Sequence, residues 1–302
     1  MGFLSSLPTI KTEVFASLPK KYRDLGQRKA GSAPRFKNVD SFLEGPAFDR
    51  EGNLYVADIV YGRIFKVSPQ GNFDLVVQYD GEPNGLRIHK DGRIFIADYK
   101  NGIMVLDPKT GDVSPFLRTR HTESLRGVND LVFSSNGDLF FTDQGMTGLQ
   151  DPTGRVYRYS AAGHTECLLY NAPSPNGIAL SPNDDTLYVA MTVTAEVWNM
   201  APRCDGSSKV ARFTQMICGG FDGLVVDEKG NLVIANIRVG VLWVVSNKGE
   251  PIYRIPSCGG DMTTNMAYGG PDRKQLFITD STNGNILVAD MPFPGKVLYS
   301  HL

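Results

Sequence analysis

Polar side chains recur along this chain at a nearly constant interval, each at the start of a short apolar segment. The six side chains are Glu44, Asn84, Asn129, Asn176, Asp222 and Asn265. Their separations are 40, 45, 47, 46 and 43 residues (84 − 44, 129 − 84, 176 − 129, 222 − 176 and 265 − 222). All six carry oxygen donors of the hard type that calcium, magnesium and manganese prefer. If the repeats close into a ring, these oxygens converge on one axis and could hold such an ion.

Four of the six positions are predicted to be metal ligands, namely Glu44, Asn129, Asn176 and Asp222. They combine two carboxylates with two neutral amides, and neither histidine nor cysteine stands at any of these positions. Calcium is the first choice because a wide ring built from separate repeats tolerates about six to eight ligands, with water completing the set. Magnesium, manganese and zinc are the alternatives. Asn84 and Asn265 share the same phase, and either a structural role or a contact with substrate is open for them.

Asn-Gly and Asp-Gly steps are also common in ordinary turns. Asn-Gly occurs in such turns elsewhere in this chain, at Asn101, Asn136 and Asn283. The recurring positions differ from these turns because they precede an apolar strand instead of following one. Their constant phase favours a shared structural position over a set of independent turns.

Each repeat contains four short runs of β-branched and aromatic residues. In the first repeat these runs are Glu44–Asp49, Asn53–Asp58, Arg63–Val67 and Phe73–Gln78, and Gly, Pro and Asp separate them. Such runs and breaks indicate strands and turns. Four strands in a unit of roughly 40–45 residues are typical of a β-propeller blade. The six units therefore predict an all-β fold, a six-bladed β-propeller with four-stranded blades that forms one domain over residues 1–302.

The sixth blade needs an outer strand to close the ring. Its other strands are predicted at Gln275–Thr279 and Asn285–Ala289, and the outer strand could come from Lys296–Ser300 or from Thr12–Leu18. We favour the N-terminal segment because it precedes the first blade and has no other partner. The polar stretch Lys20–Asn38 is predicted to be a surface loop that could cover one mouth of the tunnel.

Composition limits the partners of this chain. The formal net charge is −1, with acids and bases interspersed, which argues against nucleic acid and anionic membranes as partners. The four cysteines lie far apart without a CxxC pair, which argues against a zinc site or a disulfide framework. No apolar stretch reaches the roughly 20 residues of a membrane span, and the N-terminus does not resemble a secretory signal. We expect a cytoplasmic monomer or small homo-oligomer that binds a small molecule.

The chain resembles the SMP-30/gluconolactonase/LRE-like family in four segments: EGPAFDREGNLYVAD, VNDLVFSSNGDLFFTD, SPNGIALSPNDDTLYVA and FDGLVVDEKGNLVIAN. This family includes regucalcin-type gluconolactonases, a staphylococcal lactonase and squid-type diisopropyl fluorophosphatase. The resemblance implies a six-bladed propeller with one divalent cation held by Glu44, Asn129, Asn176 and Asp222. It also implies that the acid at position 222 is both a ligand and a candidate base or nucleophile. Some relatives carry a second, structural calcium, which this chain could share.

A divalent cation suits lactone hydrolysis because it can polarise the ester carbonyl and stabilise the oxyanion that develops there. Asp222 is predicted to be the general base that takes a proton from the attacking water. Direct attack by Asp222 as a nucleophile is the open alternative. Asp130 is the second candidate catalytic residue because it adjoins Asn129 and could hold or relay a proton.

Residues after the second strands or before the inner strands should line the mouth of the site. The candidates are Tyr99, Arg126, Gln144, Met146, Thr192 and Arg238. Tyr99, Arg126 and Met146, together with Asn84 and Asn265, are predicted to bind substrate. Regucalcin-type gluconolactonases place a substrate-binding arginine two residues before the third-blade asparagine. Arg126 lies three residues before Asn129, so the resemblance does not extend to sugar lactones in particular.

Three functions are compatible with these residues. The leading hypothesis is a metal-dependent lactonase that opens a small 1,4- or 1,5-lactone to a hydroxy acid. The first alternative is an organophosphate or phosphotriester hydrolase, because the same ion can polarise a phosphoryl oxygen. The second is a calcium-binding propeller without catalysis. A WD-type scaffold is disfavoured because the chain has only two tryptophans and no Trp-Asp step.

Overall fold

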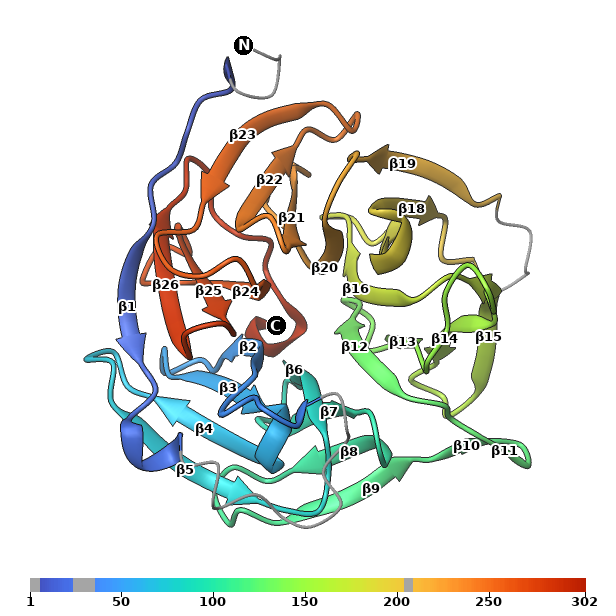
Figure 1. Ribbon diagram of the computed structural model, residues 1–302. Coiled ribbons are helices and arrows are strands. Elements are labelled where there is room, and N and C mark those ends of the chain that lie inside the picture. Colours follow the sequence, from blue (N-terminus) through green and yellow to red (C-terminus); the bar gives the residue numbers. More distant parts are fainter. Residues whose placement is uncertain (1–5, 24–35, 204–208) are drawn as a thin grey trace.

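Six four-stranded antiparallel sheets surround a central tunnel in the computed structural model, which describes residues 6–23, 36–203 and 209–302 (Figure 1). Each sheet is one blade, with its first strand nearest the tunnel in Figure 1. The predicted six-bladed β-propeller with four-stranded blades is confirmed. The expected strand boundaries of the first repeat differ from the observed ones by one residue at most.

The strands of each blade follow in order from the tunnel outward. Blade 1 comprises β2 (Leu43–Phe48), β3 (Leu54–Asp58), β4 (Arg63–Val67) and β5 (Phe73–Gln78). Blade 2 comprises β6 (Pro83–Ile88), β7 (Ile94–Asp98), β8 (Gly102–Leu106) and β9 (Val113–Leu117). Blade 3 comprises β12 (Val128–Phe133), β13 (Leu139–Asp143), β14 (Gly154–Tyr159) and β15 (Thr165–Ala172). Blade 4 comprises β16 (Pro175–Leu180), β17 (Leu187–Met191), β18 (Glu196–Met200) and β19 (Ala211–Gln215).

The remaining two blades complete the ring. Blade 5 comprises β20 (Gly220–Val226), β21 (Leu232–Ile237), β22 (Val241–Val245) and β23 (Pro251–Pro256). Blade 6 comprises β24 (Thr263–Gly269), β25 (Gln275–Asp280), β26 (Asn285–Asp290) and β1 (Glu13–Ser17). A short hairpin of β10 (Thr119–Arg120) and β11 (Glu123–Ser124) lies between blades 2 and 3.

The outer strand of blade 6 comes from the N-terminal segment. In this strand, Glu13 lies opposite Val288 and Ser17 lies opposite Asn285 in an antiparallel register. The alternative candidate, Lys296–Ser300, forms no strand. Most of the predicted surface loop, residues 24–35, lies outside the described residues. The two ends of the chain's propeller region are therefore joined within one sheet, which closes the ring.

Helices are few in the described residues. They are four short 3₁₀ turns: η2 (Lys20–Tyr22), η5 (Ile59–Tyr61), η6 (Thr192–Thr194) and η7 (Tyr299–His301). No helix in this part of the chain has the length and apolar character needed to cross a membrane.

The apolar core consists of one cluster between each pair of neighbouring blades. Between blades 6 and 1, for example, the rings of Phe48 and Phe277 lie 4.9 Å apart, and Ala16 of β1 belongs to the same cluster. Full burial of an apolar side chain of this kind contributes about 1.5–3 kcal/mol. The N-terminal strand β1 is therefore held by side-chain packing as well as by its backbone hydrogen bonds to β26.

Every inner strand carries one extra residue relative to its neighbouring strand, near the recurring polar position. Val128 pairs with Asp143 and Leu131 pairs with Phe141, so three steps along β12 match two along β13. The other five inner strands show the same shift at the equivalent position. A β-bulge of this kind interrupts the ladder and re-aims the side chains at the irregularity. The bulges therefore give Glu44, Asn84, Asn129, Asn176 and Asp222 one shared position on the inner strands. The expectation that Asn265 shares this phase is wrong, because Thr263 pairs with Asp280 as Val128 pairs with Asp143, which makes Thr264 the counterpart of Asn129 and Asn265 the counterpart of Asp130.

Candidate metal and active site

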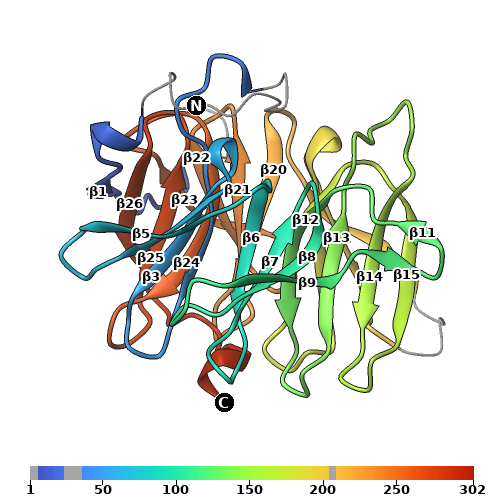
Figure 2. The same ribbon diagram turned by 90° about the horizontal axis from the view of Figure 1, so that it is seen from below.

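The six recurring residues, which we call the ring residues (Glu44, Asn84, Asn129, Asn176, Asp222 and Asn265), lie at one end of the tunnel. All are buried, with 1–8% of each residue exposed. The C-terminus lies at the opposite end (Figure 2). The ring residues therefore form a buried polar layer at the end of the tunnel away from the C-terminus.

Glycine after a ring residue lets adjacent inner strands come close together. A Cβ atom on Gly177 would lie 2.2 Å from the backbone oxygen of Asp222, and one on Gly45 would lie 2.1 Å from that of Asn84. No side chain can be accommodated at such distances without moving the backbone. The Asn-Gly, Asp-Gly and Glu-Gly steps of the ring are therefore points of close approach between blades, a role for glycine that differs from turn formation.

Glu44 is held by hydrogen bonds to one of its two carboxylate oxygens. Its Oε2 accepts the backbone N–H of Gly45 at 2.8 Å and the side-chain Nδ2–H of Asn265 at 3.0 Å. The other amide atom of Asn265, Oδ1, accepts the backbone N–H of Met266 at 2.9 Å. Both ends of the Asn265 amide are thus used within the protein. This side chain, which the sequence suggested for substrate binding, is placed to hold Glu44.

The amide oxygens of two predicted ligands have no donor. Asn129 gives its Nδ2–H to Gln144 Oε1 at 3.0 Å, and no described group donates to its Oδ1. Asn176 Oδ1 is fully buried and lacks a hydrogen-bond partner in the described structure. A buried polar atom without a partner carries a desolvation cost of about 1–3 kcal/mol. A buried oxygen of this kind beside the buried carboxyl groups of Glu44 and Asp222 indicates a site for a cation.

Three buried carboxyl groups lie close enough for their charges to affect ionisation. Burial raises the pKa of Glu44 to about 7, and the charge of Asp130 adds to this rise. Burial and the charges of Glu44 and Asp130 together raise the pKa of Asp222 well above its ordinary value, although a hydrogen bond from Asn176 opposes the rise. Like charges this close destabilise each other unless a cation compensates them. The raised pKa values of Glu44 and Asp222 and the unpartnered oxygen of Asn176 therefore both indicate a cation site in this layer.

These donors fit a hard divalent cation. Glu44, Asn129, Asn176 and Asp222 would supply carboxylate and amide oxygens, which suit calcium, magnesium or manganese. The described residues contain no group of three or more His, Cys, Asp and Glu side chains arranged to bind a metal, so a site here must draw on the two amides. This composition disfavours zinc, which binds mainly through nitrogen and sulfur.

Asp130 lies behind the ring and contacts blade 2. Its Oδ1 accepts the backbone N–H of Leu131 at 2.8 Å, and its Oδ2 lies 3.6 Å from a terminal nitrogen of Arg87. Burial raises the pKa of Asp130, and the Arg87 charge opposes that rise. A Cβ on Gly85 would lie 2.3 Å from Asp130 Oδ1, so the glycine leaves the space that this carboxyl group uses. Asp130 is thus held between two blades, and it acts on the ring through its charge.

The residues predicted to bind substrate are spread over different environments. Asn84 is in the ring and makes no side-chain hydrogen bond to described residues. Tyr99 covers Gly127, because a Cβ there would lie 2.8 Å from the Tyr99 ring. Arg126 is exposed and donates to Thr153 Oγ1 at 2.6 Å. Met146, with 79% of its surface exposed, lies in the loop after β13.

Acidic or amide residues at the ends of second strands have a structural role that sequence reasoning did not assign. Asp58 Oδ1 accepts the N–H of Phe42, and Asp143 Oδ1 accepts the N–H groups of Arg126 and Gly127, each within 2.8–2.9 Å. Asn236 and Asp280 accept equivalent bonds in blades 5 and 6, at 3.1 and 3.0 Å. These side chains support the loops that lead into the inner strands. The repeated Asp or Asn at the end of the second strand was the signal for this role.

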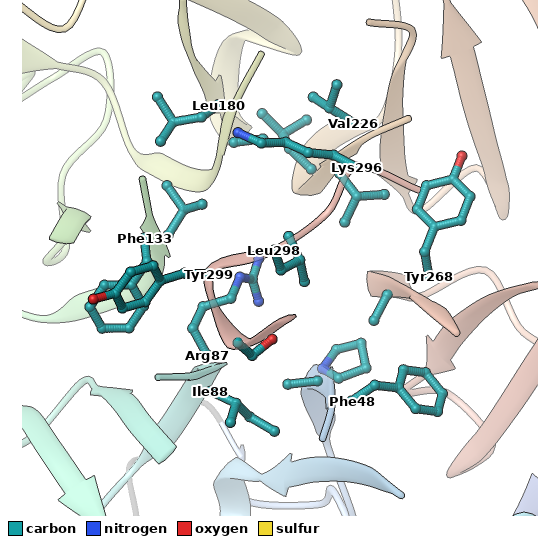
Figure 3. Close-up of a pocket in the computed structure, with 18 of the residues that line it drawn as sticks. Phe48, Arg87, Ile88, Phe133, Leu180, Val226, Tyr268, Lys296, Leu298 and Tyr299 are labelled. Atoms are coloured by element: carbon teal, nitrogen blue, oxygen red, sulfur yellow. The ribbon is translucent and has the colours of Figure 1, made fainter. Parts of the chain in front are cut away.

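A small cavity lies among the later residues of the inner strands, next to the C-terminal segment (Figure 3). Its cavity volume is about 60 Å³, and its walls are the later, mostly apolar residues of the inner strands. Arg87 points into it from β6, and Leu298 and Tyr299 of the C-terminal segment close it (Figure 3). Among the described residues, no carboxyl side chain lines this cavity. It therefore offers no carboxylate ligands for the second calcium that the resemblance suggested.

Comparisons with known proteins agree with the fold. The model of the SMP-30/Gluconolactonase/LRE-like region matches residues 42–282. A lactonase, drp35, from Staphylococcus epidermidis is 32% identical over 234 residues, which cover 72% of this chain and 70% of that protein. The corresponding lactonase of a Staphylococcus aureus strain is 32% identical over 227 residues, covering 70% of this chain and 69% of that protein.

Two solved structures show the same fold at lower identity. A gluconolactonase from Xanthomonas campestris has a TM-score of 0.74 and 24% identity, covering 83% of this chain and 86% of that chain. The calcium-binding protein regucalcin from Agrobacterium tumefaciens has a TM-score of 0.74 and 21% identity, covering 96% of this chain and 99% of that chain. The match to the family model and the similarity to the staphylococcal lactonases establish that the chain belongs to the SMP-30/gluconolactonase/LRE-like family.

Proposed function

We propose that this protein is a metal-dependent lactonase that hydrolyses a small lactone to a hydroxy acid. The observation that carries the proposal is the layer of buried oxygens without donors, in which Asn176 Oδ1 has no partner. In the same layer, burial and neighbouring carboxylates raise the pKa of both Glu44 and Asp222. The similarity to lactonases of staphylococci supports the reaction class.

Glu44, Asn129, Asn176 and Asp222 would hold the divalent cation, and calcium suits their oxygen donors best. Bound there, the cation would supply polarisation of the ester carbonyl and stabilisation of the developing oxyanion. Asn265 holds Glu44 Oε2, which leaves the other carboxylate oxygen of Glu44 available as a ligand. The calcium-binding relative from Agrobacterium tumefaciens is consistent with this choice of ion.

Asp222 is the residue that we assign to proton transfer. Its carboxylate belongs to the ring and receives hydrogen bonding only from the Asn176 amide among the described residues. A carboxylate with few donors retains its basicity, so Asp222 can take a proton from water as the water attacks the lactone carbonyl. The carboxyl group would then return that proton to the departing ring oxygen, which becomes the hydroxyl group of the product. Attack by Asp222 itself remains the alternative route.

The decisive experiment compares substrate classes with and without the cation. The purified protein is treated with EDTA and then assayed on a panel of five- and six-membered lactones and on a fluorophosphonate, before and after addition of calcium, magnesium or manganese. We expect lactone hydrolysis that EDTA abolishes and one of the cations restores. A kcat/KM larger by orders of magnitude on the fluorophosphonate would replace the lactonase proposal by a phosphotriester hydrolase. Turnover of neither class would favour the binding protein.

A further inference from the structure

Gln144 connects the ring residues of two neighbouring blades. Its Oε1 accepts the Nδ2–H of Asn129 at 3.0 Å, and its own Nε2–H is donated to Ser174 Oγ at 3.0 Å. Asn129 belongs to the ring in blade 3, whereas Ser174 lies two residues before Asn176 in blade 4. One side chain thus bridges the approaches to two predicted ligands.

The direction of these bonds decides how the Asn129 amide lies. An amide oxygen accepts hydrogen bonds and an amide nitrogen donates them. Because Gln144 presents its oxygen, Asn129 must turn its nitrogen toward Gln144 and its oxygen away. The freed Oδ1 is the atom that a hard cation requires. With the reverse orientation, Asn129 would present N–H groups to the cation and repel it.

Gln144 is itself held in place by a closed set of hydrogen bonds. Thr147 Oγ1 donates to the backbone oxygen of Gln144 at 2.6 Å and accepts the backbone N–H of Ser174 at 3.2 Å. Ser174 Oγ then accepts from Gln144 Nε2, which completes the cycle. Thr147 and Ser174 are both buried, at 8% and 6% exposure. Thr147 therefore anchors the Gln144 backbone, and the Gln144 side-chain amide contacts a serine that Thr147 also holds.

Ser174 adopts a backbone conformation that needs such support. Its φ is 61°, a left-handed conformation that residues other than glycine rarely adopt. Pro175 follows it, and a residue before proline normally prefers an extended conformation. The backbone oxygen of Ser174 accepts the N–H of Thr192 at 3.0 Å. Strain of this kind clusters at functional sites, where the surroundings hold it in place.

We infer that Gln144 is a positioning residue, which holds the Asn129 amide with its oxygen free for the cation. Thr147 and Ser174 fix Gln144 and link blade 3 to blade 4. This inference rests on the proposed cation site and adds to it the device that orients one ligand. Glutamine occupies this position after the second strand only in blade 3. Asn265 holds Glu44 on the other side of the ring, so two different amides orient two different ligands.

Calcium titration of the full-length protein tests this role without relying on activity. The EDTA-treated protein is titrated with calcium by isothermal titration calorimetry, and its thermal unfolding is measured without calcium. Gln144→Met removes both bonds at similar size, and we expect the calcium Kd to rise about 10–100-fold, with the Tm of the calcium-free protein near that of the wild type. Gln78→Met is the matched control. It removes the bond from Gln78 Nε2 to Tyr61 oxygen, 3.1 Å long, in blade 1, and should leave the calcium Kd unchanged.

A second variant, Asn129→Asp, distinguishes orientation of the Asn129 amide by Gln144 from general structural support of the site. Asn129→Asp replaces the amide by a carboxylate with two equivalent oxygens, which needs no orientation. In that background, Gln144→Met should change the calcium Kd by less than about threefold, since the coupled contact has already been removed. Should Gln144→Met fold poorly, Gln144→Glu takes its place, because Glu keeps the acceptor for Asn129. Gln144→Glu should bind calcium at least as tightly as the wild type, and a weaker affinity would contradict the role of Gln144 as the acceptor for Asn129.

Three outcomes would overturn the assignment. A calcium Kd for Gln144→Met within about threefold of the wild type would remove Gln144 from the site and leave the lactonase proposal intact. An equal loss of affinity in the wild-type and Asn129→Asp backgrounds would show general support instead of amide orientation. A wild-type protein that binds none of calcium, magnesium and manganese would overturn the cation site, and the role of Gln144 with it.

Discussion

The two ends of the tunnel are built from the same six inner strands but differ in hydrogen bonding and packing. At the ring end, the amide oxygens of Asn129 and Asn176 lack donors. Burial and neighbouring carboxylates raise the pKa of Glu44 and Asp222 in the same layer. At the other end, the later residues of the inner strands are mostly apolar, and the C-terminal segment covers them. The unpartnered oxygen at one end creates a place for a ligand, whereas apolar contacts with the C-terminal segment at the other end hold the blades together.

The C-terminal segment contacts several blades as it crosses the tunnel. Lys296 N–H donates to Val226 oxygen at 3.0 Å, and Lys296 Nζ pairs with Asp184. The ring of Tyr299 lies 5.3 Å from that of Phe133 and 5.0 Å from that of His89. Blades 2 to 5 are thus connected by one short segment. We infer that the start of each inner strand serves ligand binding, whereas its later residues hold the blades together through the C-terminal segment. Four predictions test whether these two roles are independent.

The largest effect is expected at the ring. Asp222→Asn retains an oxygen ligand but removes the base, so kcat on a lactone that the wild type hydrolyses should fall about 10²–10⁴-fold. The same change removes one of the mutually repelling charges, so the Tm of the EDTA-treated protein should rise. Steady-state kinetics and thermal unfolding measure the two effects. Asp227→Asn, in the turn after the same strand, is the control and should keep kcat near that of the wild type.

If Asp222→Asn kept near-wild-type turnover, Asp222 would have no part in the mechanism. A fall in the Tm of the EDTA-treated variant would instead contradict the view that the ring is destabilised by its own charges. Either result would contradict the description of the ring end as a charged site built for a ligand.

The next effect is expected at the C-terminal end. Tyr299→Ala removes an aromatic ring that is 8% exposed and packed among other rings, and it should lower the free energy of unfolding by about 2–4 kcal/mol. Urea unfolding measures this loss. Tyr170→Ala, whose tyrosine is 74% exposed, should change it by less than about 0.5 kcal/mol. The calcium Kd of Tyr299→Ala should stay at its wild-type value, and a roughly tenfold change would show that the two ends are coupled.

A smaller effect is expected from the close approach between blades 4 and 5. Gly177→Ala would place a Cβ atom 2.2 Å from Asp222 oxygen, and the forced shift should cost about 1–3 kcal/mol in the free energy of unfolding and weaken calcium binding. Gly92→Ala is the matched control. Gly92 has a φ of +91°, and open space surrounds the point where an alanine methyl would lie, so it should cost about 1–2 kcal/mol through backbone strain without changing calcium affinity. Equal calcium Kd values for both variants would contradict this role of Gly177.

The smallest effect is expected at the mouth. Met146→Ala changes a side chain that is 79% exposed, so the free energy of unfolding should move by less than about 0.5 kcal/mol. If Met146 contacts substrate, KM should rise while kcat stays constant, because the side chain would contribute only binding. Unchanged KM values across the lactone panel would remove Met146 from the substrate site.

The sequence by itself determined the architecture. Strand runs, turn residues and the period of 40 to 47 residues are local or repetitive signals, and each repeat forms the same four-stranded unit. For that reason the blades, their strands and the shared position of five ring residues could be predicted, whereas Asn265 lies one position further along its strand. The choice of Glu44, Asn129, Asn176 and Asp222 also came from the sequence, through phase and family resemblance, and their role as ligands stays a prediction.

Only the tertiary structure decided what chemically similar residues at nearly the same interval do. Val128 pairs with Asp143 and Thr263 pairs with Asp280, so Thr264 is the counterpart of Asn129, and Asn265 lies one position further on. Asn129 faces Gln144, whereas Asn265 donates to Glu44 from the neighbouring blade. Those partners come from other strands or blades, so no local pattern reveals them. Arg87, which lies next to Asp130 across two blades, is a further case. The direction of a side chain depends on the bulge beneath it and on the neighbours that the closed ring brings together, and these are set when the blades pack.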